Sequence, residues 1–249
     1  MALTLRTRHW GGGERRILLL HGISWNTAGW WRLGPDLAER GWDVTAVDLR
    51  GHGASPGGDD YRLSSYAEDV LALGRWDVVL GHSLGGALAV LASSVSPRFS
   101  KRLILQEPAL LLAPIPIDES VRWLLEPYGR PRTVEAIAAD NPSWHPEDVR
   151  LKIEALGQCS PAVVEATVRD NPDWNLIAET AGLLVPTTII GGDPEYGGIV
   201  PVTIGEWFAA ENPFVKYVVL AGSGHSAHRE PASYEAYLGI VLGAAEGEA

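Results

Sequence analysis

Short apolar runs alternate along this chain with segments in which apolar residues recur at helical spacing. Runs that are rich in Val, Ile and Leu and end in Gly or a polar residue are typical of buried parallel strands. They occupy residues 16–20, 44–48, 78–80, 103–105, 187–190 and 217–220. The clearest helical segments between them are residues 34–40, 65–73 and 84–94. This alternation predicts an α/β fold with a mostly parallel sheet, helices on both of its faces, and an antiparallel edge strand at residues 3–8.

The alternation stops between about residues 112 and 181, where no apolar run is typical of a strand. Pro131, Pro146 and Pro161 each stand where a first helical turn would begin, so this stretch is expected to be helical. A helical stretch between two strands of one sheet indicates an inserted lid. The predicted organisation is a core domain in two parts, residues 1–112 and 181–249, with a helical lid at residues 113–180.

Charge and composition narrow the partners that this chain can have. Acidic residues outnumber basic ones by 31 to 20, and the net charge of −11 would repel a phosphate backbone. No apolar run approaches the roughly 18 residues that a membrane helix needs, and residues 1–10 lack the apolar core of a signal peptide. Cys159 is the only cysteine, so no internal disulfide can form. We expect a cytoplasmic protein without nucleic-acid or membrane partners, and a homodimer is compatible with the sequence.

Residues 81–85 read Gly-His-Ser-Leu-Gly, a G-x-S-x-G motif that lies between an expected strand and an expected helix. In such a place a sharp turn pushes the serine oxygen above the sheet, and the two glycines leave room for the turn. The N-terminus of the following helix aims backbone N–H groups at negative charge that develops on a substrate. This context makes Ser83 the candidate nucleophile.

Three further motifs follow a set order along the chain: Leu-His-Gly-Ile at residues 20–23, Asp-Leu-Arg-Gly-His-Gly-Ala-Ser at 48–55, and Gly-His at 224–225. Together with the G-x-S-x-G motif, they make the chain resemble the α/β-hydrolase superfamily over nearly its whole length. The resemblance implies an eight-stranded sheet. It also implies a catalytic serine, acid and histidine in that order along the chain, with His225 as the histidine.

The position of His225 in the predicted sheet supports the same role. It follows the last apolar run in a Gly-Ser-Gly-His loop, at the carboxyl edge of the sheet that Ser83 also occupies. We therefore expect His225 to be the general base that takes the serine proton. His228 is its nearest rival and is expected to anchor the loop. The side chain of His82 is expected to point away from the nucleophile, and His21 is expected to be structural.

The catalytic acid has two main candidates. The superfamily usually carries it after the strand that here ends at residue 190, where Asp193 stands first and Glu195 second. This loop departs from the usual G-x-x-D-x-x-V-P spacing, and Asp-Pro often opens a turn. Glu107 ends the strand next to the nucleophile strand, a placement similar to that in haloalkane dehalogenases and some lactone hydrolases of the superfamily. We favour Glu107 and keep Asp193 as the alternative.

The oxyanion hole and the pocket are assigned by position. The resemblance implies that the backbone N–H groups of Ile23 and Leu84 form the hole. Trp25 follows this loop and Trp123 lies in the expected lid, so both are expected to line the substrate pocket. Most of the 10 tryptophans are expected to pack the lid on the core. An apolar, aromatic pocket favours a hydrophobic substrate over a sugar or a charged metabolite.

These features predict a serine hydrolase that cleaves a carboxylic ester or lactone of a small hydrophobic substrate through an acyl-serine intermediate. A diketone C–C hydrolase would use the same triad, and a non-catalytic ligand-binding protein could keep the same fold. A dehalogenase is disfavoured because it needs a carboxylate nucleophile where this chain has Ser83. The sequence contains no H-E-x-x-H motif and no cysteine pair, so neither a metal nor a cofactor is expected.

Overall fold

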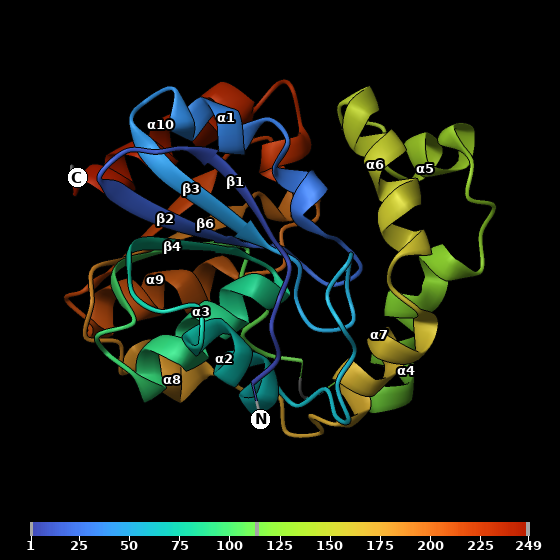
Figure 1. Cartoon of the computed structure of the whole chain (residues 1–249), viewed down its shortest axis with the longest axis horizontal. Helices are drawn as coiled ribbons and strands as arrows, with labels where there is room; N and C mark the ends of the chain where they lie inside the picture. Colours follow the sequence, from blue (N-terminus) through green and yellow to red (C-terminus); the bar gives the residue numbers. More distant parts are fainter. Residues whose placement is uncertain (1, 113–114, 248–249) are drawn as a thin grey trace.

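The computed structural model describes residues 2–112 and 115–247. These residues form one seven-stranded sheet in the order β1-β3-β2-β4-β5-β6-β7 (Figure 1). Strand β1 runs antiparallel to β3, and all other neighbouring strands are parallel, which confirms the predicted mostly parallel sheet. The strands are β1 (Thr7–Gly11), β2 (Arg15–Leu20), β3 (Trp42–Val47), β4 (Trp76–His82), β5 (Ser100–Gln106), β6 (Thr187–Gly192) and β7 (Val215–Leu220).

Two details of the predicted sheet are wrong. The described residues form seven strands where eight were expected, and the edge strand begins at Thr7 instead of residue 3. The residues before β1 are held by groups outside the sheet. The Leu3 N–H donates to the Asp69 carboxylate (2.6 Å), and the Arg6 N–H donates to the Ser55 hydroxyl (2.8 Å). Because these side chains use the backbone donors, the segment does not pair as a longer or additional strand.

Both faces of the sheet are buried, as the continuous apolar strands predict. In β2, Ile17 and Leu19 pack into one hydrophobic cluster while Leu18 and Leu20 pack into another, because successive side chains point to opposite faces. Helices cover both faces of the sheet (Figure 1). The first face carries α1 (Leu33–Ala38) and α10 (Tyr234–Glu246), and the second carries α2 (Leu63–Leu71), α3 (Leu84–Val95), α8 (Ile177–Ala181) and α9 (Val202–Glu211).

Four further α-helices lie between β5 and β6 and stand apart from the sheet faces in Figure 1. We call them, with the 3-10 turn η2 (Glu126–Tyr128), the insertion helices: α4 (Ile117–Leu125), α5 (Val134–Asp140), α6 (Pro146–Gly157) and α7 (Pro161–Arg169). Residues 113–114 of the expected lid lie outside the described residues, and α8 packs beside α3 and α9. In the described chain, no helix is long and apolar enough to cross a membrane.

Proline marks two of the three helix starts that the sequence suggested. Pro146 and Pro161 are the first residues of α6 and α7. The expectation at Pro131 is wrong, because α5 begins at Val134, where the Thr133 side chain caps the helix by accepting from the backbone N–H of Ala136 (3.3 Å). The remaining 3-10 turns are η1 (Thr27–Trp30), η3 (Pro194–Tyr196) and η4 (Ala227–Arg229).

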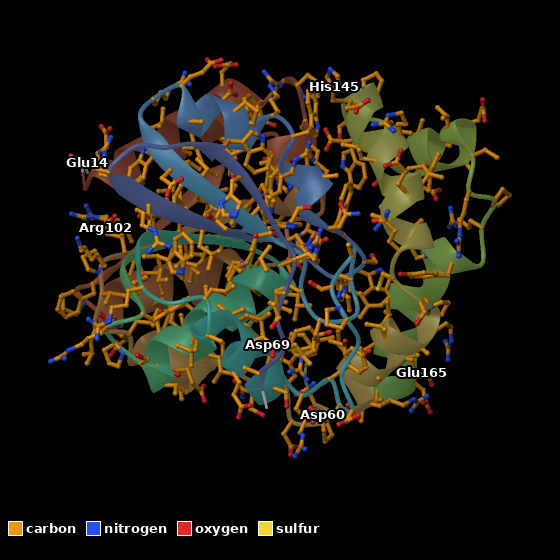
Figure 2. The ribbon with its side chains drawn as sticks, in the orientation of Figure 1. Glu14, Asp60, Asp69, Arg102, His145 and Glu165 are labelled. Atoms are coloured by element: carbon orange, nitrogen blue, oxygen red, sulfur yellow. The ribbon has the colours of Figure 1, made fainter. Side chains whose placement is uncertain are left out.

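One buried ion pair joins the loop after β3 to α2. The Arg50 Nε donates to the Asp69 carboxylate at 2.7 Å, and the two side chains are 4% and 1% exposed. Arg50 also donates to the backbone carbonyls of Asp60 and Ser65, each at 2.8 Å. Asp69 and Asp60 lie on the side of the sheet that carries α2 (Figure 2). Since Asp69 also accepts from the Leu3 N–H, the pair holds three segments together.

Replacing Arg50 with Met should therefore destabilise the fold strongly. The change leaves the buried Asp69 carboxylate without its cation, which typically costs about 3–5 kcal/mol. Urea unfolding followed by circular dichroism measures the loss. Arg62→Met is the matched control, because Arg62 is 63% exposed and its contact with Asp60 is a surface ion pair worth about 0–1 kcal/mol. Equal stability of the two variants would contradict a structural role for the Arg50 pair.

Candidate active site

The G-x-S-x-G segment forms a tight turn between β4 and α3. Ser83 caps α3 with φ 53° and ψ −116°, outside the regions that most residues adopt. The glycines are required by close backbone contacts. A Cβ at Gly81 would lie 2.3 Å from the Gly85 carbonyl oxygen, and a Cβ at Gly85 would lie 2.2 Å from that of Leu20. The turn thus exists because the sequence has no side chain at either position.

Backbone strain is concentrated at the same edge of the sheet. In residues 2–112 and 115–247, the non-glycine residues with positive φ are Ser24, Ser83 and Glu107. Each follows the carboxyl end of a strand or the loop beyond it, after β2, β4 and β5 respectively. Conformations of this kind cost about 1–3 kcal/mol each and persist where surrounding contacts hold them, often at functional sites.

Glu107 is a buried carboxylate, 1% exposed, and backbone donors surround it. Its Oε1 accepts from the N–H of Gly192 at 2.7 Å and of Val200 at 3.4 Å. Its Oε2 accepts from the N–H of Ile199 and lies 3.3 Å from the Nδ1 of His225. These donors come from the end of β6, the loop after η3 and the loop after β7. The arrangement satisfies both carboxylate oxygens and holds His225 by one ring nitrogen.

Asp193, the alternative acid, is used elsewhere. It caps η3 by accepting from the Glu195 N–H at 3.0 Å, and its other oxygen accepts from the Gly222 N–H at 3.0 Å. The turn-opening role that the Asp-Pro sequence indicated is therefore present in the structure. Glu195 is exposed in the same turn. Of the two main candidates, the structure brings Glu107 to His225 and directs Asp193 to the backbone of its own loop and the next.

The His82 side chain contacts the loop that carries His225. Its Nε2–H donates to the backbone carbonyl of His225 at 3.0 Å, and the two ring centroids lie 4.6 Å apart. Its ring also meets the ring of His228 edge-on, with centroids 4.8 Å apart. Burial, with the neighbouring His225 and His228, holds the pKa of His82 well below its usual range. A neutral His82 therefore supports the backbone that carries His225.

The other candidate histidines are packed into the structure. His228 is buried and its ring stacks on Trp30, with centroids 4.9 Å apart. His21 donates from Nδ1 to the Gly22 carbonyl (2.7 Å) and accepts at Nε2 from the Leu49 N–H (3.0 Å). Burial lowers the pKa of His21 to about 4. Its neutral ring thus fixes the loop after β2 against the loop after β3.

The loop after β2 touches the serine turn, where the oxyanion hole was expected. A Cβ at Gly22 would lie only 3.1 Å from the Cβ of Ser83, so glycine permits the two loops to meet. Ile23 and Leu84 both line the cavity that Ser83 borders. The structure thus brings both expected donor residues to the cavity wall that Ser83 borders.

A cavity of about 660 Å³ lies between this edge of the sheet and the insertion helices. Its volume suits a small organic ligand. Ser83 and His225 lie in its wall, and both predicted pocket tryptophans, Trp25 and Trp123, line it. Trp25 is buried, whereas Trp123 is 58% exposed. The remaining aromatic and large apolar lining residues include Trp144, Trp174, Leu110, Leu124, Ile177, Ile199, Val200 and Ile204.

Comparison with known proteins places this geometry in a family. The model of the Alpha/beta hydrolase family matches residues 17–236. The chain belongs to this family. The lipase LipV of Mycobacterium tuberculosis is 32% identical over 131 residues, and the match spans 50% of this chain and 49% of the lipase. The pimeloyl-acyl carrier protein methyl ester esterase of Edwardsiella ictaluri is 27% identical over 238 residues, which span 89% of this chain and 91% of the esterase.

Solved structures give the same fold. The chain resembles an esterase from Exiguobacterium antarcticum with a TM-score of 0.80, over 97% of its own length and 95% of that esterase. The identity is 20%, so this likeness concerns the fold alone. The lipase-like and esterase-like relatives within the family are the curated proteins.

Sequence reasoning missed a buried charged group in this cavity. Lys152 lines the cavity from α6, and Asp148 lies one turn earlier on the same buried stripe of that helix. The signal was present in the sequence, because both polar residues share a helical face with Val149, Leu151 and Ala155. Elsewhere, the described residues contain no cluster of three or more His, Cys, Asp or Glu side chains arranged to hold a metal ion.

The two candidate acids of the hydrolase can be separated by amide substitutions. Glu107→Gln should lose about 10⁴-fold in turnover, because the carboxylate that orients and stabilises the His225 imidazole is removed. Asp193→Asn should keep most of its turnover. Rates are measured with para-nitrophenyl acetate on variants shown to be folded by circular dichroism, since an unpaired buried group can cost about 1–3 kcal/mol of stability. An inactive Asp193→Asn beside an active Glu107→Gln would restore the usual family arrangement.

Proposed function

We propose that this hydrolase cleaves a carboxylic ester or lactone of a hydrophobic substrate through an acyl-serine intermediate. The main support is the 3.3 Å contact between Glu107 and His225 at the wall of an apolar cavity that Ser83 also lines. In this proposal Ser83 is the nucleophile, His225 is the general base and Glu107 is the acid that orients the imidazole.

Acylation follows from these roles. The Ser83 Oγ bonds to the carbonyl carbon while the His225 Nε2 accepts the hydroxyl proton. The carbonyl oxygen becomes an oxyanion, and the imidazolium is stabilised at Nδ1 by Glu107. The bond from the carbonyl carbon to the leaving oxygen then breaks, and that oxygen takes the proton from His225. The acyl group remains on Ser83.

Deacylation repeats these steps with water. His225 accepts a proton from the water as its oxygen attacks the acyl carbon, and the bond to the Ser83 oxygen breaks as that oxygen regains a proton. The products are a carboxylic acid and the free hydroxyl of Ser83. In both halves the N–H groups of Ile23 and Leu84 donate to the oxyanion, and one such donor is typically worth about 10²–10³-fold in turnover.

The cavity supports the substrate class. Its walls carry several tryptophans and aliphatic side chains, which favour an apolar acyl or alcohol group close to the catalytic residues. The lipase and methyl ester esterase among the relatives act, by their names, on ester bonds. The insertion helices form the far wall of the cavity, so we assign substrate selection to them and the chemistry to the strand ends.

Ser83→Ala should stay folded and lose up to about 10⁶-fold in turnover. A fluorophosphonate probe should label the unmodified protein at Ser83 and leave the variant unlabelled, as peptide mass spectrometry measures. Ser94→Ala is the matched control, because Ser94 is exposed on the same helix and should keep full labelling and full activity. Full activity in Ser83→Ala, or labelling at another serine, would overturn the acyl-serine mechanism.

Trp123→Ala tests the insertion helices as the selecting wall. Trp123 is largely exposed yet lines the cavity, so its loss removes substrate contact with little loss of core packing. We expect KM to rise about tenfold for long-chain para-nitrophenyl esters and to change little for the acetate. Trp207→Ala is the control, since Trp207 is 41% exposed on α9 and does not line the cavity. Equal effects on short and long esters would refute the selecting role.

A further inference from the structure

The apolar cavity contains a buried cation that no acidic side chain compensates. Lys152 is 7% exposed, and its ammonium donates to the Ser24 carbonyl oxygen (3.1 Å) and to the Ser24 hydroxyl (2.8 Å). Both partners are neutral. Among the described residues, no carboxylate lies within ion-pair distance of Lys152. Two of the three ammonium hydrogens are thus occupied, and one remains for another acceptor.

A second cation lies beside it. The Arg229 guanidinium stacks on the Trp25 ring at 3.6 Å, and the Lys152 ammonium lies 5.0 Å from the same ring. Two buried carboxylates lie near Arg229: Asp148, whose oxygen lies 3.8 Å from the Arg229 Nε, and Glu230, whose charge also raises the pKa of Arg229. Neither forms an ion pair with Lys152. In a cluster of Lys152, Arg229 and Asp148, the Lys152 ammonium is therefore the excess positive charge that no described carboxylate pairs.

Burial makes this excess costly. It lowers the pKa of Lys152 to about 7, with help from Arg229, and the pKa of Arg229 to about 9. Burial also raises the pKa of Asp148 to about 6. A buried ammonium without an ionic partner is stabilised when an anion joins it in the same low-dielectric space. An anionic ligand could supply the negative charge that the Lys152 ammonium lacks.

This cation is close to the proposed chemistry. Ser24 directly follows Ile23, the expected oxyanion donor, and the adjoining Gly22 packs against Ser83. Lys152, Ser24 and Ser83 all line the same cavity. A ligand bound to Ser83 can therefore reach the ammonium without leaving the cavity.

We propose that Lys152 binds a carboxylate carried by the substrate. This hydrolase then prefers esters that carry a hydrophobic chain at one end and an acid group at the other. This inference rests on the proposed ester hydrolysis and names its substrate class. The apolar walls take the chain, and the free hydrogen of the ammonium donates to one carboxylate oxygen. One free donor on a single unpaired ammonium matches a monoanionic carboxylate better than a phosphate dianion.

The contact with Ser24 offers a competing role. Lys152 could act only by holding the strained Ser24 backbone and, through it, the Ile23 amide. Loss of that support would slow the hydrolysis of every ester, whatever its charge. A carboxylate site instead predicts a loss confined to charged substrates.

A pair of matched esters separates the two roles. One is the mono-para-nitrophenyl ester of adipic acid, and the other has the same chain with an isopropyl group in place of the carboxylate. The unmodified protein should show at least a tenfold higher kcat/KM for the acid, after correction for spontaneous hydrolysis. Lys152→Met should lower kcat/KM for the acid by about tenfold to a hundredfold and leave the neutral ester nearly unchanged. Lys216→Met, on the exposed part of β7, removes one charge outside the cavity and should change neither value.

Several outcomes would overturn the carboxylate site. The first is an equal loss of kcat/KM on both esters in Lys152→Met, which would make Lys152 a support of the oxyanion loop. The second is no loss on either ester. The third is no preference for the acid in the unmodified protein. The comparison of the two esters on the unmodified protein needs no variant. It tests the carboxylate site even if Lys152→Met does not fold.

A binding measurement keeps this inference separate from the proposed reaction. Calorimetry on Ser83→Ala should show that monomethyl adipate binds at least tenfold more tightly than the matched isopropyl-terminated methyl ester, and that adding Lys152→Met removes the difference. Turnover of no ester together with this binding difference would refute ester hydrolysis and retain the carboxylate site. Turnover of both esters without this binding difference would retain ester hydrolysis and refute the carboxylate site.

Discussion

Burying the Glu107 carboxylate obliges the surrounding chain to supply hydrogen-bond donors, and much of the strand-end geometry follows from that requirement. The donors belong to Gly192, Ile199, Val200 and His225, which lie in segments after or at the ends of β6 and β7. Satisfying one side chain just after β5 therefore fixes three segments that are distant in sequence from it. The same carboxylate that completes the fold at this edge also sets the orientation of the His225 ring.

The serine turn depends on this arrangement, because its strained conformation has to be held from outside. The Ser83 N–H donates to the Gln106 carbonyl at 3.1 Å, and the Ser83 carbonyl accepts from the Ala109 N–H at 3.0 Å. Both partners flank Glu107, which is itself at φ 45°. Two strained residues on adjacent strands are thus supported by the same few hydrogen bonds, so neither can relax without disturbing the other.

Sequence periodicity and motifs predicted the elements whose structure is determined by residues nearby in sequence. The parallel strands, Ser83 at its turn and the helix starts at Pro146 and Pro161 all depend on neighbours in sequence. The choice between Glu107 and Asp193 does not depend on neighbours in sequence. Both residues follow a strand, and only the three-dimensional course of the loops separates them. The contact of His82 with His225 could not be predicted for the same reason, because it depends on the course of the loop after β7. Lys152 was overlooked because its cost appears only once α6 is packed against the core.

The insertion helices and the core are joined by polar contacts as well as by apolar packing, and two of these contacts reach the loop after β2. Lys152 reaches Ser24, the Asn26 amide donates to Gln158 at 2.8 Å, and the His145 N–H donates to the Arg229 carbonyl at 2.8 Å. His145 stands at the start of α6 (Figure 2), so this helix is tied to the core near both of its ends. Any displacement of α6 would therefore pull on the segment that follows Ile23. These hydrogen bonds link the wall proposed to contact the substrate to the loop proposed to stabilise the oxyanion. The link explains how a cation on an inserted helix can lie so close to the strand ends.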